Sequence, residues 1–208
     1  MKKIIIVGAG GFGREAYYLI KDINKVEPTW KFLGFLDDSQ TSLLDKKIDA
    51  PILSTIDGWT PSDDEWYVLG IASPRVKELV VERLRKKRIK NFATLVSPQA
   101  IINETAVIGD GCVITAFSSI GDCSTIGDFV NVAGSCIGQD VFVDDYTTTT
   151  AYVNIPNSKV GKRCFIGSHS VILGSLGDDV EVVTGSVVFH KVKSGLKIMG
   201  YPAKKIVL

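Results

Sequence analysis

Residues 101–137 read IINETAVIGDGCVITAFSSIGDCSTIGDFVNVAGSCI, and they contain the clearest repeat in the chain. Branched aliphatic residues recur in it at every sixth position, and the last comes one residue early: Ile102, Ile108, Ile114, Ile120, Ile126, Val132 and Ile137. The residue two positions before each is mostly small, and glycine or a polar residue tends to follow. Short strands with one bulky and one small inward side chain, joined by tight turns, predict a parallel β-solenoid.

The six-residue pattern extends beyond this stretch. It continues to Val143, becomes irregular over residues 144–158, and returns at aliphatic positions nearer the C-terminus: Val160, Ile166, Ile172, Val182 and Val188. Because the irregular stretch is rich in threonine, it is either one irregular coil or an excursion from the solenoid. Cys112 and Cys164 occupy small inward positions, so we expect them to fill the core.

The N-terminal part has a different character. Short apolar runs alternate with amphipathic stretches over residues 1–92, which is typical of a parallel sheet covered by helices. Helical spacing of apolar residues predicts one helix over 14–25 and another that starts at Pro74. The predicted strands are apolar runs at 3–7, 32–36 and 66–71. We therefore expect an α/β domain over 1–92 and a β-solenoid over 93–208.

The composition excludes some classes of protein. The 208 residues are 45% hydrophobic and carry a formal net charge of +1, which offers no broad field for binding nucleic acid or an anionic membrane. The four cysteines form no CxxC pair, and no histidine lies close enough in the sequence to complete a zinc site. We therefore expect no metal and a cytoplasmic protein with reduced thiols. The first apolar run ends at Gly8, too short for the core of a signal peptide, and no stretch reaches membrane-spanning length.

A glycine-rich loop follows the first predicted strand. Gly8, Gly10 and Gly13 form a GxGxxG pattern, which lets the backbone approach a ligand while a helix N-terminus offers free N–H groups to an anion. Asp37 or Asp38 follows the second strand, where a dinucleotide site has an acidic residue. The domain holds only about half of a doubly wound fold, which is enough for one mononucleotide. A nucleotide-linked sugar is therefore a better ligand than NAD.

Several motifs together carry a family resemblance over nearly the whole chain. They are IVGAGGFGRE (6–15), GFLDD (34–38), Gly70 followed by Arg75, ATLVSPQA (93–100), IGDF (126–129), VGKRCFIG (160–167) and GYPAKKI (200–206). The chain thereby resembles the sialic acid O-acetyltransferases and bacillosamine N-acetyltransferases, a group within the hexapeptide-repeat acyltransferases. The resemblance implies a small Rossmann-like βαβ domain followed by a left-handed parallel β-helix.

The resemblance also implies ligands and an assembly. Relatives form homotrimers, bind acetyl-CoA between neighbouring prisms, and hold a nucleotide-linked sugar in the N-terminal domain for glycan biosynthesis. The residues that it assigns to the substrate are Gly10, Gly11, Asp37, Asp38 and Arg75. Those that it assigns to acetyl-CoA are turn glycines, namely Gly138, Gly167 and Gly185.

The residues expected to act as bases depart from the family pattern. Relatives have a catalytic histidine two residues after an inward aliphatic, where this chain has Asp122, and a second histidine where it has Asn131. A sugar amine depends less on a base than a hydroxyl does, because its lone pair attacks before a proton leaves. The substitution therefore favours N-acylation of an amino-sugar nucleotide, with Asp122 and Asn131 as candidate catalytic residues. Asp122 would steer the amine and take up its proton.

Three alternatives stay open at the level of sequence. His169 lies three residues after Ile166, on a turn of the solenoid, and is a weaker candidate base; His190 precedes the terminal segment. The enzyme could instead O-acetylate a sialic acid or related sugar. The chain could also be a non-catalytic paralogue that binds nucleotide sugars without turnover.

Overall fold

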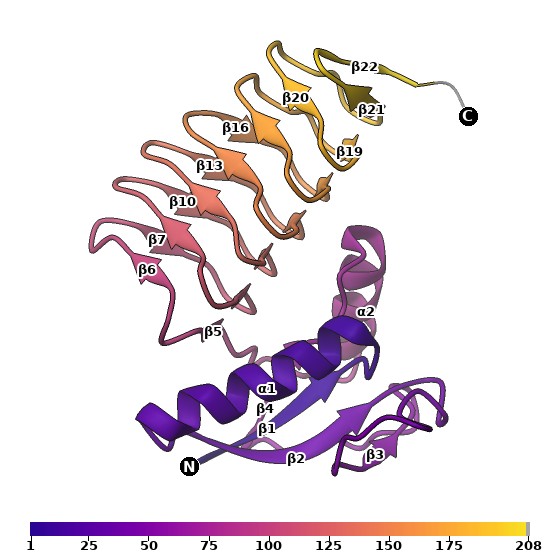
Figure 1. The fold of residues 1–208 in the computed structure, drawn as a ribbon. Coiled ribbons are helices and arrows are strands. Elements are labelled where there is room, and N and C mark those ends of the chain that lie inside the picture. The colour runs from indigo at the N-terminus through magenta and orange to yellow at the C-terminus, as the bar shows by residue number, and fades with distance from the viewer. Residues whose placement is uncertain (207–208) are drawn as a thin grey trace.

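The chain folds into two parts, one above the other in Figure 1, in a computed structural model that describes residues 1–206. The N-terminal part is a parallel sheet with two helices, and the remainder is a column of short strands wound in coils. The predicted fold class, a small βαβ domain followed by a parallel β-helix of hexapeptide repeats, is confirmed.

Four parallel strands form the N-terminal sheet, in the order β3-β2-β1-β4. Their bounds are Lys2–Val7 for β1, Trp30–Leu36 for β2, Ile52–Ser54 for β3 and Glu65–Leu69 for β4. The three predicted strands are confirmed, although the last ends at Leu69 because Gly70 turns the chain toward the glycine-rich loop. The short strand β3 was not predicted, since three residues give no readable alternation.

Two helices cover the two faces of this sheet. They are α1 (Gly11–Val26) and α2 (Pro74–Lys86). Successive residues of a strand point to opposite faces, so Ile4 packs with α1 and Ile5 packs with α2. α1 begins three residues before the predicted start because Gly10 serves as its N-cap.

The solenoid is a three-sided prism, and its three faces are called A, B and C. Face A contains β5 (Leu95–Val96), β8 (Val113–Ile114), β11 (Asn131–Val132), β14 (Thr148–Thr149), β17 (Phe165–Ile166), β19 (Glu181–Val182), β21 (Lys197–Gly200) and the antiparallel β22 (Ala203–Lys205). Face B contains β6 (Ile101–Ile102), β9 (Ser119–Ile120), β12 (Cys136–Ile137), β15 (Asn154–Ile155), β18 (Val171–Ile172) and β20 (Val187–Val188). Face C contains β7 (Val107–Ile108), β10 (Thr125–Ile126), β13 (Phe142–Val143) and β16 (Lys159–Val160).

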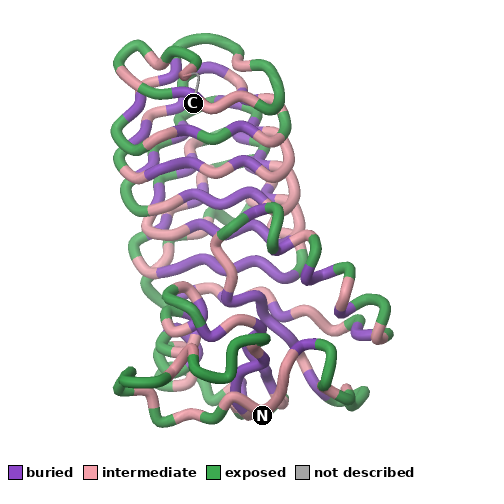
Figure 2. The backbone as a smooth tube through the Cα atoms, turned by 90° about the vertical axis from the view of Figure 1, so that its right-hand side faces the viewer, coloured by how far each residue is buried: buried purple, intermediate pink, exposed green. Residues whose placement is uncertain are grey.

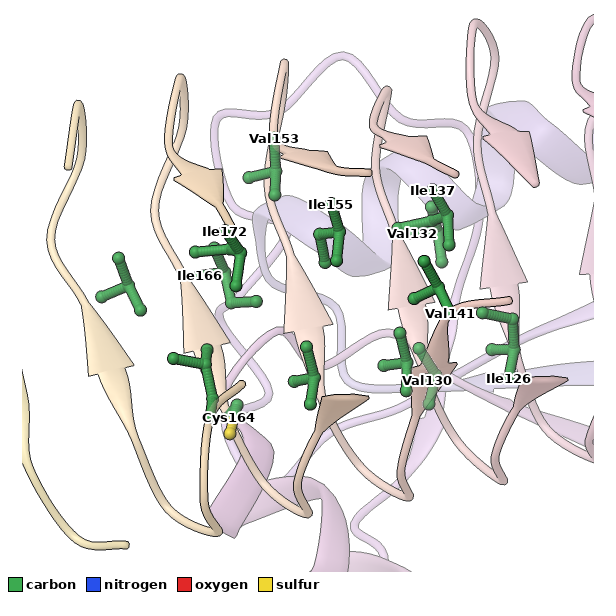
Figure 3. Close-up of a cluster of buried hydrophobic side chains, with 14 of the residues drawn as sticks. Ile126, Val130, Val132, Ile137, Val141, Val153, Ile155, Cys164, Ile166 and Ile172 are labelled. Carbon is green, nitrogen blue, oxygen red and sulfur yellow. The ribbon is translucent and has the colours of Figure 1, made fainter. Parts of the chain in front are cut away.

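The predicted six-residue pattern is the stacking pattern of the core. Each predicted aliphatic is the second residue of its strand, and Ile126, Ile137 and Ile166 point into the prism in Figure 3. Burial recurs along every coil (Figure 2). Cys112 and Cys164 are fully buried in this core, as predicted. The sequence pattern therefore sets the spacing of the strands from one face of the prism to the next.

The irregular stretch 144–158 is a coil of the solenoid and makes no excursion. It supplies β14 to face A and β15 to face B, in line with the coils on either side. Threonines replace aliphatic residues inside it, and Thr147 and Thr149 are fully buried. Their hydroxyls are satisfied: Thr147 Oγ1 donates to the carbonyl of Gly161 at 2.9 Å, and Thr149 Oγ1 lies 2.9 Å from Ser135 Oγ. Because threonine takes the inward positions of this coil, the aliphatic repeat does not reveal it in the sequence.

Candidate functional site

The glycine-rich loop between β1 and α1 contains two kinds of glycine. Gly8 and Gly13 are needed for packing, because a Cβ on Gly13 would clash with the carbonyl oxygen of Gly8. Gly10 and Gly11 border open space, with no heavy atom within 4 Å of a Cβ added to either. Since Gly10 is the N-cap of α1, the free N–H groups of the first helical turn lie beside this space. The loop can bind a phosphate group, because the free N–H groups carry partial positive charge and the space beside Gly10 and Gly11 is open.

The two aspartates after β2 have different surroundings. Asp37 lies against the glycine-rich loop, where its Oδ2 accepts a hydrogen bond from the backbone N–H of Ala9 at 2.7 Å. Asp38 accepts from the N–H of Ile56 and forms an ion pair with Arg83 of α2 at 2.8 Å. The Arg83 guanidinium lowers the pKa of the Asp38 carboxyl. The structure therefore places Asp37 beside Gly10 and Gly11, while Asp38 already has a cationic partner.

Arg75 lines a pocket of about 540 Å³ between the start of α2 and face A, which does not include the glycine-rich loop. Its side chain is 75% exposed, and its Nε lies 3.3 Å from a carboxylate oxygen of Asp179. Arg163 lines the same pocket and also pairs with Asp179, at 2.9 Å. Arg75 is therefore separated from the other predicted substrate residues, in a pocket of mixed charge.

A polar seam joins the N-terminal domain to face A. Lys77 of α2 is fully buried, and its Nζ donates to the carbonyl oxygens of Phe129 at 2.7 Å and Thr147 at 3.1 Å. Burial lowers the pKa of Lys77 to about 7. Thr148 Oγ1 donates to the carbonyl of Ala72 at 2.8 Å. These bonds fix the segment after β4 on the prism.

Asn131 also lies in this seam. Its Nδ2 donates to the carbonyl oxygen of Ile71 at 2.9 Å, and the residue is 1% exposed. Its Oδ1 is buried and has no hydrogen-bond partner in the part of the chain that the structure describes. The predicted catalytic Asn131 is therefore enclosed between the two domains. Its Nδ2 group binds the Ile71 backbone, and its Oδ1 atom makes no hydrogen bond within the described residues.

A groove of about 560 Å³ runs between α1 and the turns that lead from face A to face B, called here the AB edge. From α1 it is lined by Phe12, Glu15, Tyr18, Leu19 and Asp22, and from the AB edge mainly by Thr115, Phe117, Thr150 and Tyr152. Ala72, just after β4, lies at the same groove. No pattern in the sequence predicts this groove, because α1 and the turns of the AB edge come from distant parts of the chain.

His169 lies on the AB edge and is not among the residues that line this groove. It is exposed, and its ring stacks on that of Tyr152, with centroids 4.9 Å apart and an interplanar angle of 25°. Gly167 and Gly185 belong to the same edge. A Cβ on Gly167 would lie 2.6 Å from the backbone nitrogen of Thr184, so packing explains this glycine, whereas Gly185 borders open space.

Asp122 lies on the edge between faces B and C, called the BC edge. It is exposed, and its carboxylate accepts a hydrogen bond from Thr105 Oγ1. Gly138 is on the same edge and packs against Pro156 of the next coil. In a three-sided prism this edge is opposite face A, on which the N-terminal domain sits. One chain therefore does not bring Asp122 to the glycine-rich loop.

Two further features hold for residues 1–206. Neither of the two helices is long and apolar enough to cross a membrane. Within the same residues, no cluster of three or more histidine, cysteine, aspartate or glutamate side chains has the arrangement of a metal site.

Comparison with known proteins agrees with this architecture. Residues 3–84 match the PglD N-terminal domain family. The chain is 26% identical to the GDP-perosamine N-acetyltransferase of Escherichia coli O157:H7, over 97% of this chain and 95% of that protein. The solved structure of WeeI from Acinetobacter baumannii AYE matches with a TM-score of 0.85 and 26% identity, over 99% of this chain and 100% of that one.

A further solved structure extends the likeness in fold. It is the acetyltransferase domain of PglB from Neisseria gonorrhoeae FA1090 in complex with acetyl coenzyme A, which has a TM-score of 0.85 and 22% identity, over 99% of each chain. Together these matches confirm the resemblance that the sequence motifs predicted.

Proposed function

We propose that this chain, whose residues 3–84 belong to the PglD N-terminal domain family, transfers an acetyl group from acetyl-CoA to the amine of a nucleotide-linked amino sugar. The observation that carries the proposal is the open glycine-rich loop. Gly10 and Gly11 leave room at the N-terminus of α1, and Asp37 holds the loop by its bond to Ala9. This is a site for the phosphates of a nucleotide, attached to a prism whose relatives are N-acetyltransferases of nucleotide sugars.

The nature of the acceptor follows from the side chains at the positions of the family histidines. Asp122 and Asn131 stand there, and an amine acceptor needs less help from a base than a hydroxyl does. In this proposal Asp122 steers the amine. Asn131 is the second candidate catalytic residue and lies in the seam between the two domains. The acetyl donor is acetyl-CoA, the ligand named in the PglB acetyltransferase structure, with Gly138, Gly167 and Gly185 as proposed contacts.

The position of Asp122 leads to a proposal about assembly. Asp122 lies on the edge opposite the N-terminal domain of its own chain, so it can reach a sugar only on another copy. We propose a homotrimer in which the BC edge of one prism faces the substrate held by its neighbour. Such an arrangement would place acetyl-CoA in the groove between adjacent prisms.

The test is release of free thiol from acetyl-CoA with a panel of acceptors. The panel contains GDP-perosamine and UDP- and dTDP-linked amino sugars, each paired with an analogue that has a hydroxyl in place of the amine. We expect release with at least one amino sugar and much slower release with its hydroxyl partner. Release with hydroxyl acceptors alone would indicate O-acetylation instead. Binding without release would indicate a non-catalytic nucleotide-sugar-binding protein.

A further inference from the structure

The groove between α1 and the AB edge contains a carboxylate that the residues around it do not neutralise. Glu15 lines the groove and has no hydrogen-bond or ion-pair partner within residues 1–206. Its neighbour in the groove, Asp22, pairs with Lys25 at 2.6 Å. Glu15 is exposed at the groove, and an unpaired acid beside a groove suits a ligand that supplies a cation or a proton donor.

The walls of the groove are aromatic on both sides. Phe12 and Tyr18 come from α1, and Phe117 and Tyr152 come from turns of the prism. Phe117 is 82% exposed and Tyr152 is 69% exposed. Aromatic faces pack on the apolar faces of a ligand and attract an ammonium group, while a few polar groups set its orientation. Aromatic walls around one free carboxylate therefore match a sugar ring that carries an amine.

The groove begins where the glycine-rich loop ends. Phe12 directly follows Gly11, and Glu15 lies four residues after Gly11, about 6 Å along the axis of α1. Ala72, which follows β4 and the loop-packing Gly70, lines the same groove. A nucleotide held by Gly10 and Gly11 would thus have its sugar within reach of Glu15.

We propose that this groove is the subsite for the amino-sugar part of the acceptor, and that Glu15 accepts the proton that the amine loses. This inference rests on the proposed acetyl transfer. The amine nitrogen attacks the thioester carbonyl carbon, so a C–N bond forms and the C–S bond breaks. The proton of the amine passes to the Glu15 carboxylate, CoA leaves as the thiolate, and that thiolate takes up one proton from Glu15 or from water. Glu15 thereby does the work for which relatives use a histidine.

The surroundings of Glu15 suit this task. Partial desolvation by the groove walls raises the pKa of the Glu15 carboxyl, although the residue is exposed, and a raised pKa makes the carboxylate a stronger base. The other titratable groups that line the groove are Tyr18 and Asp22 on α1 and Tyr152 on the prism, with His169 stacked behind Tyr152. No cation among them competes for the Glu15 carboxylate.

The experiment compares Glu15→Gln with Glu27→Gln, a matched substitution of an exposed acid just after α1 and outside the groove. We expect E15Q to lower kcat by about 100-fold, within the usual contribution of a general base, and to lose the acidic limb of the pH profile of kcat/KM. E27Q should behave as the wild type. Turnover by E15Q within twofold of the wild type would overturn the proposal.

A binding measurement separates this inference from the proposed function. Calorimetry would compare the panel sugar with the highest affinity against the nucleoside diphosphate that it contains. We expect E15Q to weaken binding of the amino-sugar nucleotide several-fold and to leave the nucleoside diphosphate unchanged. Equal affinities in wild type and E15Q for both ligands would overturn the subsite. Absence of thiol release in the wild type, with the E15Q binding loss intact, would overturn the transfer step alone.

Discussion

Two acidic side chains near the edges of the prism have different surroundings. Beside the AB edge, Glu15 of α1 is exposed but lines a groove with aromatic side chains on both walls. On the BC edge, Asp122 is exposed on a turn and accepts a hydrogen bond from Thr105. A position matched by the repeat pattern is therefore only one part of a site. The walls of a groove come from a second element, here α1, or from another copy.

The largest expected effect concerns the seam that places the N-terminal domain beside the AB edge. Burial lowers the pKa of Lys77 to about 7, whereas an unfolded chain keeps the lysine proton up to about pH 10. The unfolded state therefore binds more protons in this range, and the contribution of Lys77 to stability rises with pH. We expect the unfolding free energy of the wild type minus that of Lys77→Met to rise by on the order of 1 kcal/mol per pH unit between pH 7 and 10.

Chemical denaturation at several pH values measures this difference. Lys86→Met is the control, because Lys86 is an exposed lysine at the end of the same helix. Its difference from the wild type should be flat with pH. A flat difference for K77M as well would show that Lys77 keeps its ordinary pKa and that the seam tolerates a charged amine.

A second, smaller effect tests the aromatic wall of the groove. Tyr152→Ala removes a ring that is 69% exposed on the AB edge. We expect KM for the amino-sugar nucleotide to rise by about tenfold, since contact with an aromatic face contributes roughly 1.4 kcal/mol, and kcat to change little. Phe142→Ala on face C is the matched control, because Phe142 is 38% exposed and lies outside the groove. Equal KM values for both variants would argue against a sugar in the groove.

The smallest effect is expected on the BC edge. If Asp122 steers the amine and Glu15 takes its proton, Asp122→Asn should lower kcat by less than about tenfold, because an amide still offers an oxygen to the amine. Steady-state rates at saturating acetyl-CoA measure this. A loss as large as that of E15Q would make the BC edge the place where the proton is taken up. The contrast between the two edges would then be reversed.

The prism could be predicted from the sequence, while the groove could not. The aliphatic residues from Ile102 to Ile137 recur once for each face of the prism, so the position of each in the core can be predicted from the sequence alone. Thr147 and Thr149 escaped the pattern because satisfied hydroxyls replace aliphatic side chains there. Glu15 and Tyr152 line one groove only because α1 packs beside the prism, and no short sequence pattern predicts this long-range proximity.

Among the predicted substrate residues, the sequence was informative for those that lie at the glycine-rich loop itself. Gly10 and Gly11 open at the N-terminus of α1, and Asp37 lies against their loop. Asp38 and Arg75 depend on partners distant in sequence, Arg83 and Asp179, which set their surroundings. The sequence shows that Asp38 and Arg75 are charged, but it does not show which residues of opposite charge they pair with.

The most direct test of the account is a crystal structure of the protein with CoA and the amino-sugar nucleotide that turns over best. We expect the phosphates at Gly10 and Gly11, the sugar in the groove beside α1, and its amine within hydrogen-bond distance of Glu15. A sugar amine bound away from this groove, with Glu15 left in solvent, would contradict it.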